Sequence, residues 1–380
     1  MEKIFKKGLF IIVFGVLLLP LLQQNVFFID CGPLHGYYSD APETKPTLKK
    51  WFDGSFQEEE NNYLNDHMGL RPYLIRINNQ VGFSLFQQYY GGCTLGSDNY
   101  LYYDNYIDAY YGRDYAGYNA LYDQLKKLKA VQDTFSKLGK TIVAVYAPCK
   151  AWYFTEHIPG YLRSAKMLPN NYKTCIRIGD SLGIRQIDLN SWYMALKNTE
   201  QEALYPRWGI HWTNYGSILA IDTIIRNIEN SRHIRMPHPA WTKVVHTTEA
   251  RDPDNDMGST LNLLIVPKPD LLCYPELFYK TDSTTTKPRI IFIGDSYSVN
   301  FIRTGVLQNI SDHWQFWFVF KFVVDSTDYN NYDYIKMENY DWKTEMNKAD
   351  CFVLLNTAKN ANILGNGFIQ AAYDYYYPGK

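Results

Sequence analysis

One short segment of the chain combines residue types that can attack an acyl group. Residues 288–298 read PRIIFIGDSYS, an apolar run followed by Gly294, Asp295 and Ser296. The apolar run predicts a buried strand, and the residues after it predict a turn that opens a helix. A serine in that position lies at the carboxyl edge of a parallel sheet, and its own N–H can stabilise an oxyanion. Ser296 is therefore a candidate nucleophile, although Asp and Ser in this position are also ordinary helix caps.

A serine nucleophile needs a base, and His211 is the candidate among eight histidines. It lies in the segment GIHWTNYG, residues 209–216, just before a predicted helix with Thr213 as its N-cap. The positive end of that helix disfavours imidazolium, so we expect His211 to be neutral, as a general base must be. The alternative interpretation is a packing histidine beside Trp212.

Several segments together resemble the alginate O-acetyltransferase group (AlgX/AlgJ-like) of the SGNH hydrolases. The GDSYS block at residues 294–298 resembles the nucleophile block of that family, and the segment from His211 to Gly216 resembles its DxHW block. The histidine also precedes the serine along the chain, as it does in this family. By this resemblance Ser296 is the nucleophile and His211 the base.

Two weaker matches support the resemblance. Lys150, followed by Glu156 and Pro159, is similar to a P-x-K segment of the family, and the group Asp66–Arg71 resembles a feature near the start of its folded region. Asp66 and Arg71 are also suited to an ordinary ion pair that fixes a turn.

The resemblance implies a fold and a function. The fold is an SGNH-hydrolase-like three-layer sandwich with a mainly parallel central sheet, and the activity is transfer of acetyl groups to polysaccharide hydroxyls without a bound cofactor. A membrane-bound O-acyltransferase would supply the acetyl group, since an extracytoplasmic enzyme has no acetyl-CoA. The alternatives are a carbohydrate acetylesterase and a catalytically silent polysaccharide-binding or scaffold subunit.

One departure from the family pattern concerns the third member of a triad. Gly209 stands where DxH would place the orienting aspartate. Three explanations remain open. A backbone carbonyl or a distant acid such as Asp188, at the end of a predicted strand, orients His211; the enzyme is a Ser-His dyad; or the protein is inactive. Loss of the aspartate in a serine protease lowers turnover by ~10⁴.

Other side chains are candidates for supporting roles. Asn356, immediately after a predicted strand, is placed to donate to an oxyanion, although Asn is also a common turn residue. Lys150, Trp212 and Tyr297 are candidates for substrate binding, while aromatic residues are more often part of a core. The acidic segment 252–258 lacks the glycine and the terminal acid of an EF-hand, so we expect a solvated or cleft-lining loop and no metal.

The elements that must position these residues alternate along the chain. Apolar periodicity predicts one helix from Tyr118 and another within residues 58–84 that is interrupted near Gly69 and Pro72, and short strands and loops over residues 99–118. Strands alternating with helices indicate an α/β domain. The predicted strands are Thr141–Ala147, Ile184–Leu189, Arg289–Ile293, Trp314–Val324 and Cys351–Leu355, and the later helices are Ser217–Asn230 and Asn362–Tyr373.

The N-terminus predicts attachment to a membrane. Lys3, Lys6 and Lys7 precede the uncharged apolar run 8–22, which is typical of a signal peptide or a signal anchor. The run lacks a small-x-small cleavage site, which favours a single-pass inner-membrane anchor with the lysines in the cytoplasm and the rest in the periplasm. We expect residues 1–30 to form this segment, 31–50 a tether, and 51–380 the SGNH-like domain, with an N-terminal elaboration over about 51–117.

Composition excludes some functions. The 38 basic and 39 acidic residues leave a net charge of -1, which gives no field for a polyanion, so we expect no nucleic-acid partner. The six cysteines form no CxxC pair and are not expected to be catalytic.

Overall fold

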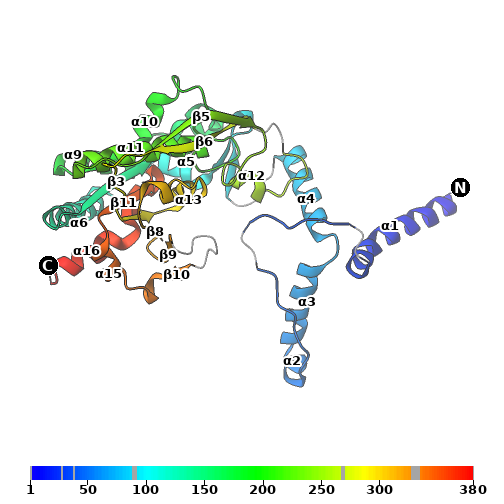
Figure 1. The fold of residues 1–380 in the computed structure, drawn as a ribbon. Coiled ribbons are helices and arrows are strands. Elements are labelled where there is room, and N and C mark those ends of the chain that lie inside the picture. Colours follow the sequence, from blue (N-terminus) through cyan, green and yellow to red (C-terminus); the bar gives the residue numbers. More distant parts are fainter. Residues whose placement is uncertain are drawn as a thin grey trace. The chain divides into compact units, whose positions relative to one another are not determined.

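The computed structural model describes residues 2–26, 29–36, 39–87, 92–266, 270–326 and 334–379. Within these residues the central sheet has seven strands in the order β10-β9-β8-β7-β11-β3-β4 (Figure 1). Neighbours from β8 to β4 pair in parallel, whereas β9 and β10 add an antiparallel edge. The strands are β3 Thr141–Ala147, β4 Gln186–Asp188, β7 Ile290–Gly294, β8 Trp314–Phe318, β9 Phe322–Asp325, β10 Ile335–Lys336 and β11 Cys351–Thr357. This is the predicted α/β fold with a mainly parallel sheet.

Helices cover both faces of the sheet, which explains why β3, β7 and β11 are buried along their whole length. Alternate residues of each strand enter opposite cores: Ala144 packs in the core with α6, α9 and α16, and Val145 in the core with α11, α13 and α14. The helices are α6 Tyr118–Lys137, α9 Asn171–Leu182, α16 Phe368–Tyr376, α11 Asn214–Arg232, α13 Val299–Arg303 and α14 Leu307–Ile310. The result is three layers, with α11 and the β5–β6 ribbon on the same side of the sheet (Figure 1).

Several regions differ from the sequence prediction. The helix expected over Asn362–Tyr373 begins only at Phe368, after the 3₁₀ turns of residues 358–367. The single strand expected over Trp314–Val324 is a hairpin, because Val319 and Phe320 adopt positive φ and turn the chain between β8 and β9. The stretch expected to hold short strands and loops contains β2 Leu101–Tyr103 but also a helix, α5 Asp104–Tyr111.

Further elements occur between residues 93 and 367. An antiparallel ribbon of β5 and β6, which sequence analysis did not predict, packs against α11. These elements are β1 Cys93–Leu95, α7 Lys150–Tyr153, α8 Gly160–Arg163, α10 Leu189–Leu196, β5 His238–Thr247, α12 Asp256–Thr260, β6 Leu272–Lys280 and α15 Trp342–Lys348, with 3₁₀ turns η1 Ser97–Asn99, η2 Thr155–His157, η3 Ser296–Ser298, η4 Met337–Asn339 and η5 Ala358–Gly367.

The chain divides into two units. Unit 1 holds residues 1–91 and 258–267, and unit 2 holds 92–257 and 268–380. Residues 92–117, which sequence analysis assigned to the N-terminal elaboration, therefore group with the sheet.

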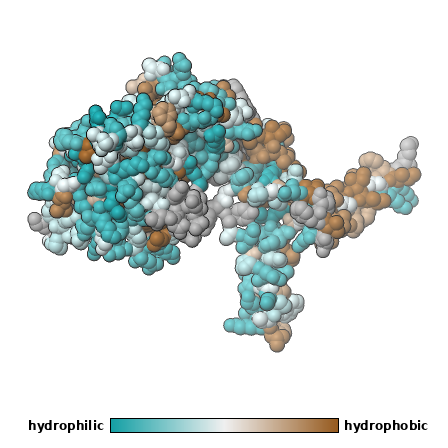
Figure 2. All heavy atoms as spheres, in the orientation of Figure 1, coloured by the Kyte–Doolittle hydropathy of each residue, from teal (hydrophilic) through white to brown (hydrophobic). Residues whose placement is uncertain are grey.

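Unit 1 is helical in its N-terminal part, with α1 Glu2–Asn25, α2 Leu48–Asp53, α3 Ser55–His67 and α4 Arg71–Phe86. The break predicted near Gly69 separates α3 from α4, and Arg71 pairs with Asp66 at 3.1 Å across it, which matches the ion-pair interpretation. Among the described residues, one helix is long and apolar enough to cross a membrane, the 22-residue span Lys3–Gln24. Its apolar side chains are exposed, as Figure 2 shows.

Candidate active site

Ser296 lies directly after β7, at the carboxyl edge of the sheet, as predicted. Gly294 ends this strand against β11, where a Cβ would collide with the backbone of Leu355. The Asp295 carboxylate accepts hydrogen bonds from Thr357 N at 2.8 Å and Thr357 Oγ1 at 3.0 Å, and from Asn360 Nδ2 at 2.9 Å. These bonds tie the nucleophile turn η3 to the end of β11 and to η5.

The side chains of Ser296 and His211 meet although 85 residues separate them. Ser296 Oγ lies 2.7 Å from His211 Nε2, within the distance expected for a nucleophile and its base. His211 Nδ1 lies 2.5 Å from Asp256 Oδ2. Because a carboxylate only accepts, this contact places the proton on Nδ1 and leaves Nε2 free to accept the serine proton. The arrangement has the geometry of a Ser-His-Asp triad.

Asp256 is held by the backbone on both sides of the contact. Its Oδ1 accepts from Ile210 N at 2.9 Å and from Met257 N at 2.9 Å, while its Oδ2 faces His211. This residue was not among the candidates predicted from the sequence. The available signal was the cluster of acids at 252–256, interpreted there only as a solvated or cleft-lining loop.

Gly209 is explained by the same loop. A Cβ at this position would lie 2.6 Å from Pro206 Cγ and 2.8 Å from the backbone O of Asp254. There is no room for the aspartate that the family motif places here, because the 252–256 segment occupies that space. The acid beside His211 comes from this segment, so of the three explanations the structure favours an orienting acid from elsewhere in the chain, but not Asp188.

The electrostatics of His211 differ from the sequence expectation. Burial by itself lowers the pKa of the imidazole, but the charge of Asp256 and its hydrogen bond outweigh burial and raise the pKa above its ordinary value. The pKa shift of His211 is therefore opposite in direction to the one expected from the α11 helix end. An adjacent carboxylate interacts more strongly than the partial charge of a helix terminus.

A second carboxylate lies behind the site. Asp254 is 1% exposed, and burial raises its pKa to about 7. Its Oδ1 accepts from Asn214 N at 2.9 Å, at the first residue of α11. Asp254 thus caps the helix that follows His211.

Asp188 does not act as the orienting acid. It accepts hydrogen bonds from the Tyr172 hydroxyl at 2.7 and 2.8 Å and from Ser191 N at 3.0 Å, which makes it the N-cap of α10. An aspartate at the end of a strand that caps the next helix is ordinary turn chemistry.

Asn356, the candidate oxyanion donor, is hydrogen-bonded to η5 through both polar atoms of its side chain. Its Oδ1 accepts from Gly365 N and its Nδ2 donates to Asn366, each at 2.9 Å. The amide is fully buried and fixes η5 against β11.

The three candidates for substrate binding are also buried and have structural partners. Lys150 Nζ donates to the backbone O of Arg207 at 2.6 Å and of Gly209 at 2.7 Å, which supports the loop before His211. Burial lowers the Lys150 pKa to about 7. Trp212 donates to Tyr297 O at 3.2 Å, and the Tyr297 hydroxyl donates to Ile210 O at 2.6 Å. Because Lys150, Trp212 and Tyr297 are each 0% exposed, they position the two catalytic candidates rather than stack on a sugar.

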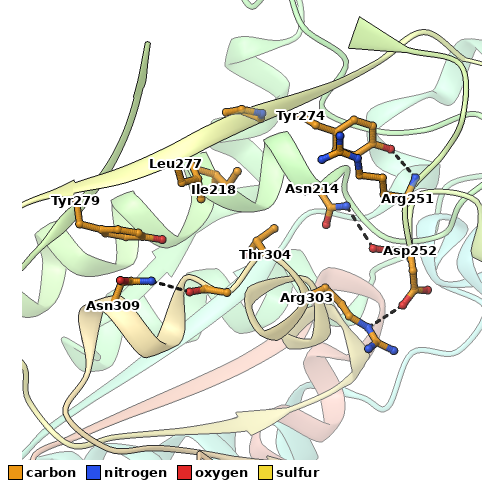
Figure 3. Close-up of a pocket in the computed structure, with 12 residues that line it drawn as sticks. Asn214, Ile218, Arg251, Asp252, Tyr274, Leu277, Tyr279, Arg303, Thr304 and Asn309 are labelled. Carbon is orange, nitrogen blue, oxygen red and sulfur yellow. Dashed lines mark hydrogen bonds and ion pairs between the residues drawn. The ribbon is translucent and has the colours of Figure 1, made fainter. Parts of the chain in front are cut away.

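A pocket of about 480 Å³ lies between the ribbon, α11 and α13 (Figure 3). Its lining includes Asn214, three residues after His211, and Asp252, from the segment that carries Asp256. Arg303 pairs with Asp252 at 2.7 Å, and Asn214 donates to Asp252 O at 3.3 Å, as Figure 3 shows. Ser296 and His211 do not line this pocket, so it neighbours the reacting atoms without containing them.

A mainly parallel sheet with serine, histidine and aspartate hydrogen-bonded in series at its carboxyl edge defines a class of acyl-transfer α/β proteins. The particular family follows from the sequence. Residues 93–315, more than half of the chain, match the sequence model of the family described as SGNH hydrolase-like domain, acetyltransferase AlgX. This chain belongs to that family.

Individual relatives are more distant. The chain is 25% identical over 241 residues to a probable alginate O-acetylase AlgJ of Pseudomonas syringae pv. tomato; the match covers 62% of this chain and 58% of that relative. The O-acetyltransferase domain of Pseudomonas putida AlgJ has a TM-score of 0.46 at 16% identity, covering 75% of this chain and all of that one. Pseudomonas aeruginosa AlgX has a TM-score of 0.44 at 12% identity, and the match covers 71% of this chain and 66% of that one.

Proposed function

We propose that this protein transfers acetyl groups to hydroxyls of a polysaccharide, with Ser296 as nucleophile, His211 as base and Asp256 as orienting acid. The observation that carries the proposal is the continuous series of short contacts, 2.7 Å from Ser296 Oγ to His211 Nε2 and 2.5 Å from His211 Nδ1 to Asp256 Oδ2. Membership of an acetyltransferase family supports this reaction over other acyl transfers.

The geometry supports two half-reactions. In the first, His211 Nε2 takes the Ser296 proton while Oγ attacks the acetyl carbonyl of the donor, and the imidazolium then protonates the leaving group. In the second, His211 takes the proton of a sugar hydroxyl, whose oxygen attacks the acetyl-serine. Ser296 leaves as the alkoxide and regains the proton from His211. The Ser296 N–H, at the start of η3, is placed to donate to the developing oxyanion.

The proposal that the acceptor is a polysaccharide rests on the family and on the relative named as a probable alginate O-acetylase. The apolar helix Lys3–Gln24, with its basic flank, supports a single-pass anchor in the inner membrane that keeps the sheet domain in the periplasm. A membrane-bound O-acyltransferase is the acetyl donor in this proposal.

The test is an assay of the full chain in detergent with a chromogenic acetyl ester, with and without an oligosaccharide acceptor, and with Ser296→Ala as the matched control. Acetylated oligosaccharide that depends on Ser296 is the expected product. Released acetate alone would instead identify an acetylesterase. Absence of both products from the folded protein would identify a silent binding subunit.

A further inference from the structure

Three side chains of different metal-binding types converge beside the β5–β6 ribbon. They are Glu202, His246 and Cys273, and their ligand atoms all lie within 4.8 Å of one another. His246 and Cys273 face each other directly in the antiparallel register of β5 and β6. Glu202 comes from the connection between α10 and α11, and its Oε1 lies 2.8 Å from His246 Nε2.

We propose that Glu202, His246 and Cys273 form a Zn²⁺ site. Thiolate, imidazole and carboxylate are the ligands that zinc takes in proteins, and the soft thiolate disfavours Ca²⁺ and Mg²⁺. Zinc bonds of ~2.0–2.3 Å in a tetrahedron put ligand atoms roughly 3.3–3.8 Å apart, so small side-chain movements complete the site. On binding, the Cys273 sulfur forms the Zn–S bond and its proton goes to solvent, while the His246 imidazole exchanges through solvent the Nε2 proton that faces Glu202 for one on Nδ1, which frees Nε2 to bind the ion.

The burial of the three ligands fits a site with three protein ligands and one water. Cys273 is 2% exposed, so it is buried, in the core that also contains side chains of α11. The side chains of His246 and Glu202 are 45% and 29% exposed, which leaves a path for the ion and room for a water ligand. The site shares no residue with the proposed triad, and its presence does not depend on the proposed acetyl transfer.

Glu202 lies next to residues that support the start of α11. The next residue, Ala203, accepts a hydrogen bond from Thr213 Oγ1 at 2.7 Å, and Leu204 O accepts from Thr213 N at 3.0 Å. Thr213 is the N-cap of α11, two residues after His211. A bound ion would therefore join the connection that supports the start of α11 to both strands of the ribbon.

Spectroscopic titration tests the site directly. The full chain in detergent is stripped with a chelator and titrated with Co²⁺, which substitutes for zinc and gives a near-ultraviolet sulfur-to-cobalt charge-transfer band only when a thiolate is a ligand. The expected result is one Co²⁺ per chain with this band, displaced by one equivalent of Zn²⁺, and a higher melting temperature with Zn²⁺ because the ion binds the folded state.

Variants locate the ligands. Cys273→Ala should abolish the band, and His246→Ala, at a partly exposed position on the ribbon, should weaken Co²⁺ binding at least tenfold. The matched controls, Cys93→Ala and His233→Asn, should retain both the band and the affinity. His246→Ala is expected to stay folded. Its Co²⁺ affinity therefore tests the proposal even if Cys273→Ala does not fold. A wild-type titration without the charge-transfer band, or unchanged affinity in folded His246→Ala, would overturn the proposal.

Discussion

The two sides of the proposed active site are built in different ways. Ser296 stands on regular structure: β7 is buried between two parallel neighbours, and Asp295 receives hydrogen bonds from the backbone and side chain of Thr357. His211 lies in an irregular segment, and Asp256 is the first residue of the short helix α12, directly after the turns at residues 252–255. There the supporting groups are buried titratable side chains, Lys150 under the loop at Gly209 and Asp254 at the start of α11.

The surroundings of Ser296 and of His211 therefore contribute different properties to the site, a fixed position on one side and titratable charge on the other. The sheet fixes where the nucleophile lies. The base side instead holds an imidazole with a raised pKa and, behind it, Asp254 and Lys150, each with a pKa of about 7. We therefore expect the pH dependence of both activity and stability to arise from the base side.

The largest effect should come from removing either reacting group. Ser296→Ala and His211→Ala should each lower kcat by ~10³-fold or more, and the double variant should be little worse than either, because residues that act as a unit are strongly non-additive. Steady-state kinetics with a chromogenic acetyl ester measure this. Additive losses in the double variant would show that the two side chains do not act together.

Asp256→Asn should separate the electrostatic role of the acid from its structural role. The asparagine Oδ1 can still accept from Ile210 N and Met257 N, so the loop should stay in place, while kcat falls by ~10³–10⁴ because the imidazole loses its orienting charge.

The same variant should shift the pH profile. The raised pKa of His211 places the acid limb of kcat/KM above pH 6.5, the ordinary value for imidazole, and without the charge of Asp256 that limb should move to lower pH. The pH–rate profiles of wild type and variant measure the shift. An unmoved limb would contradict the assignment of Asp256 to His211.

Gly209→Ala should damage the base side by packing alone. The added Cβ meets Pro206 Cγ at 2.6 Å and Asp254 O at 2.8 Å, and overpacking of this kind costs ~1–3 kcal/mol of unfolding free energy. Gly160→Ala, whose Cβ would meet Arg163 at 3.7 Å, is the matched control and should cost little. Urea unfolding of both variants measures the difference in unfolding free energy. Equal stability of the two variants would show that the 252–256 segment shifts at little cost to make room for the Cβ.

The smallest effect concerns Asp254 and appears as a pH dependence of stability. Its folded pKa of about 7 lies above the unfolded value of 3.8, so its contribution is fully present below pH 3.8 and is lost as pH rises towards 7. Asp254→Asn keeps an oxygen acceptor for Asn214 N without the charge. We expect it to be more stable than wild type by ~1–3 kcal/mol at pH 8, with the advantage vanishing near pH 4. Melting temperatures across this range measure it; a constant difference would contradict the raised pKa.

The sequence predicted the nucleophile side well. The apolar run before Gly294 gave the strand, and the alternation of strands and helices gave the layers, since burial on both faces leaves a direct pattern in the sequence. The same reasoning placed His211 just before α11, and the structure brings it to Ser296.

The acid could not be predicted in this way. Asp256 lies 45 residues after His211, where turns at residues 252–255 lead into the five-residue helix α12, and no sequence periodicity predicts where such a segment lies. The motif instead directed attention to Gly209, where the structure has no room for a side chain. Burial could not be predicted for the substrate-binding candidates either: Lys150, Trp212 and Tyr297 have the chemistry of ligand-binding residues, but each is fully buried.

The central claim is that Ser296 carries the acetyl group between donor and acceptor. Its most direct test is peptide mass spectrometry of the full chain after brief incubation with a chromogenic acetyl ester and no acceptor. The account predicts one acetyl group on the peptide that contains Ser296, removed when oligosaccharide is added and absent from Ser296→Ala and His211→Ala. Acetyl transfer that persists in Ser296→Ala, or an acetyl group stably held at another residue while Ser296 stays unmodified, would contradict it.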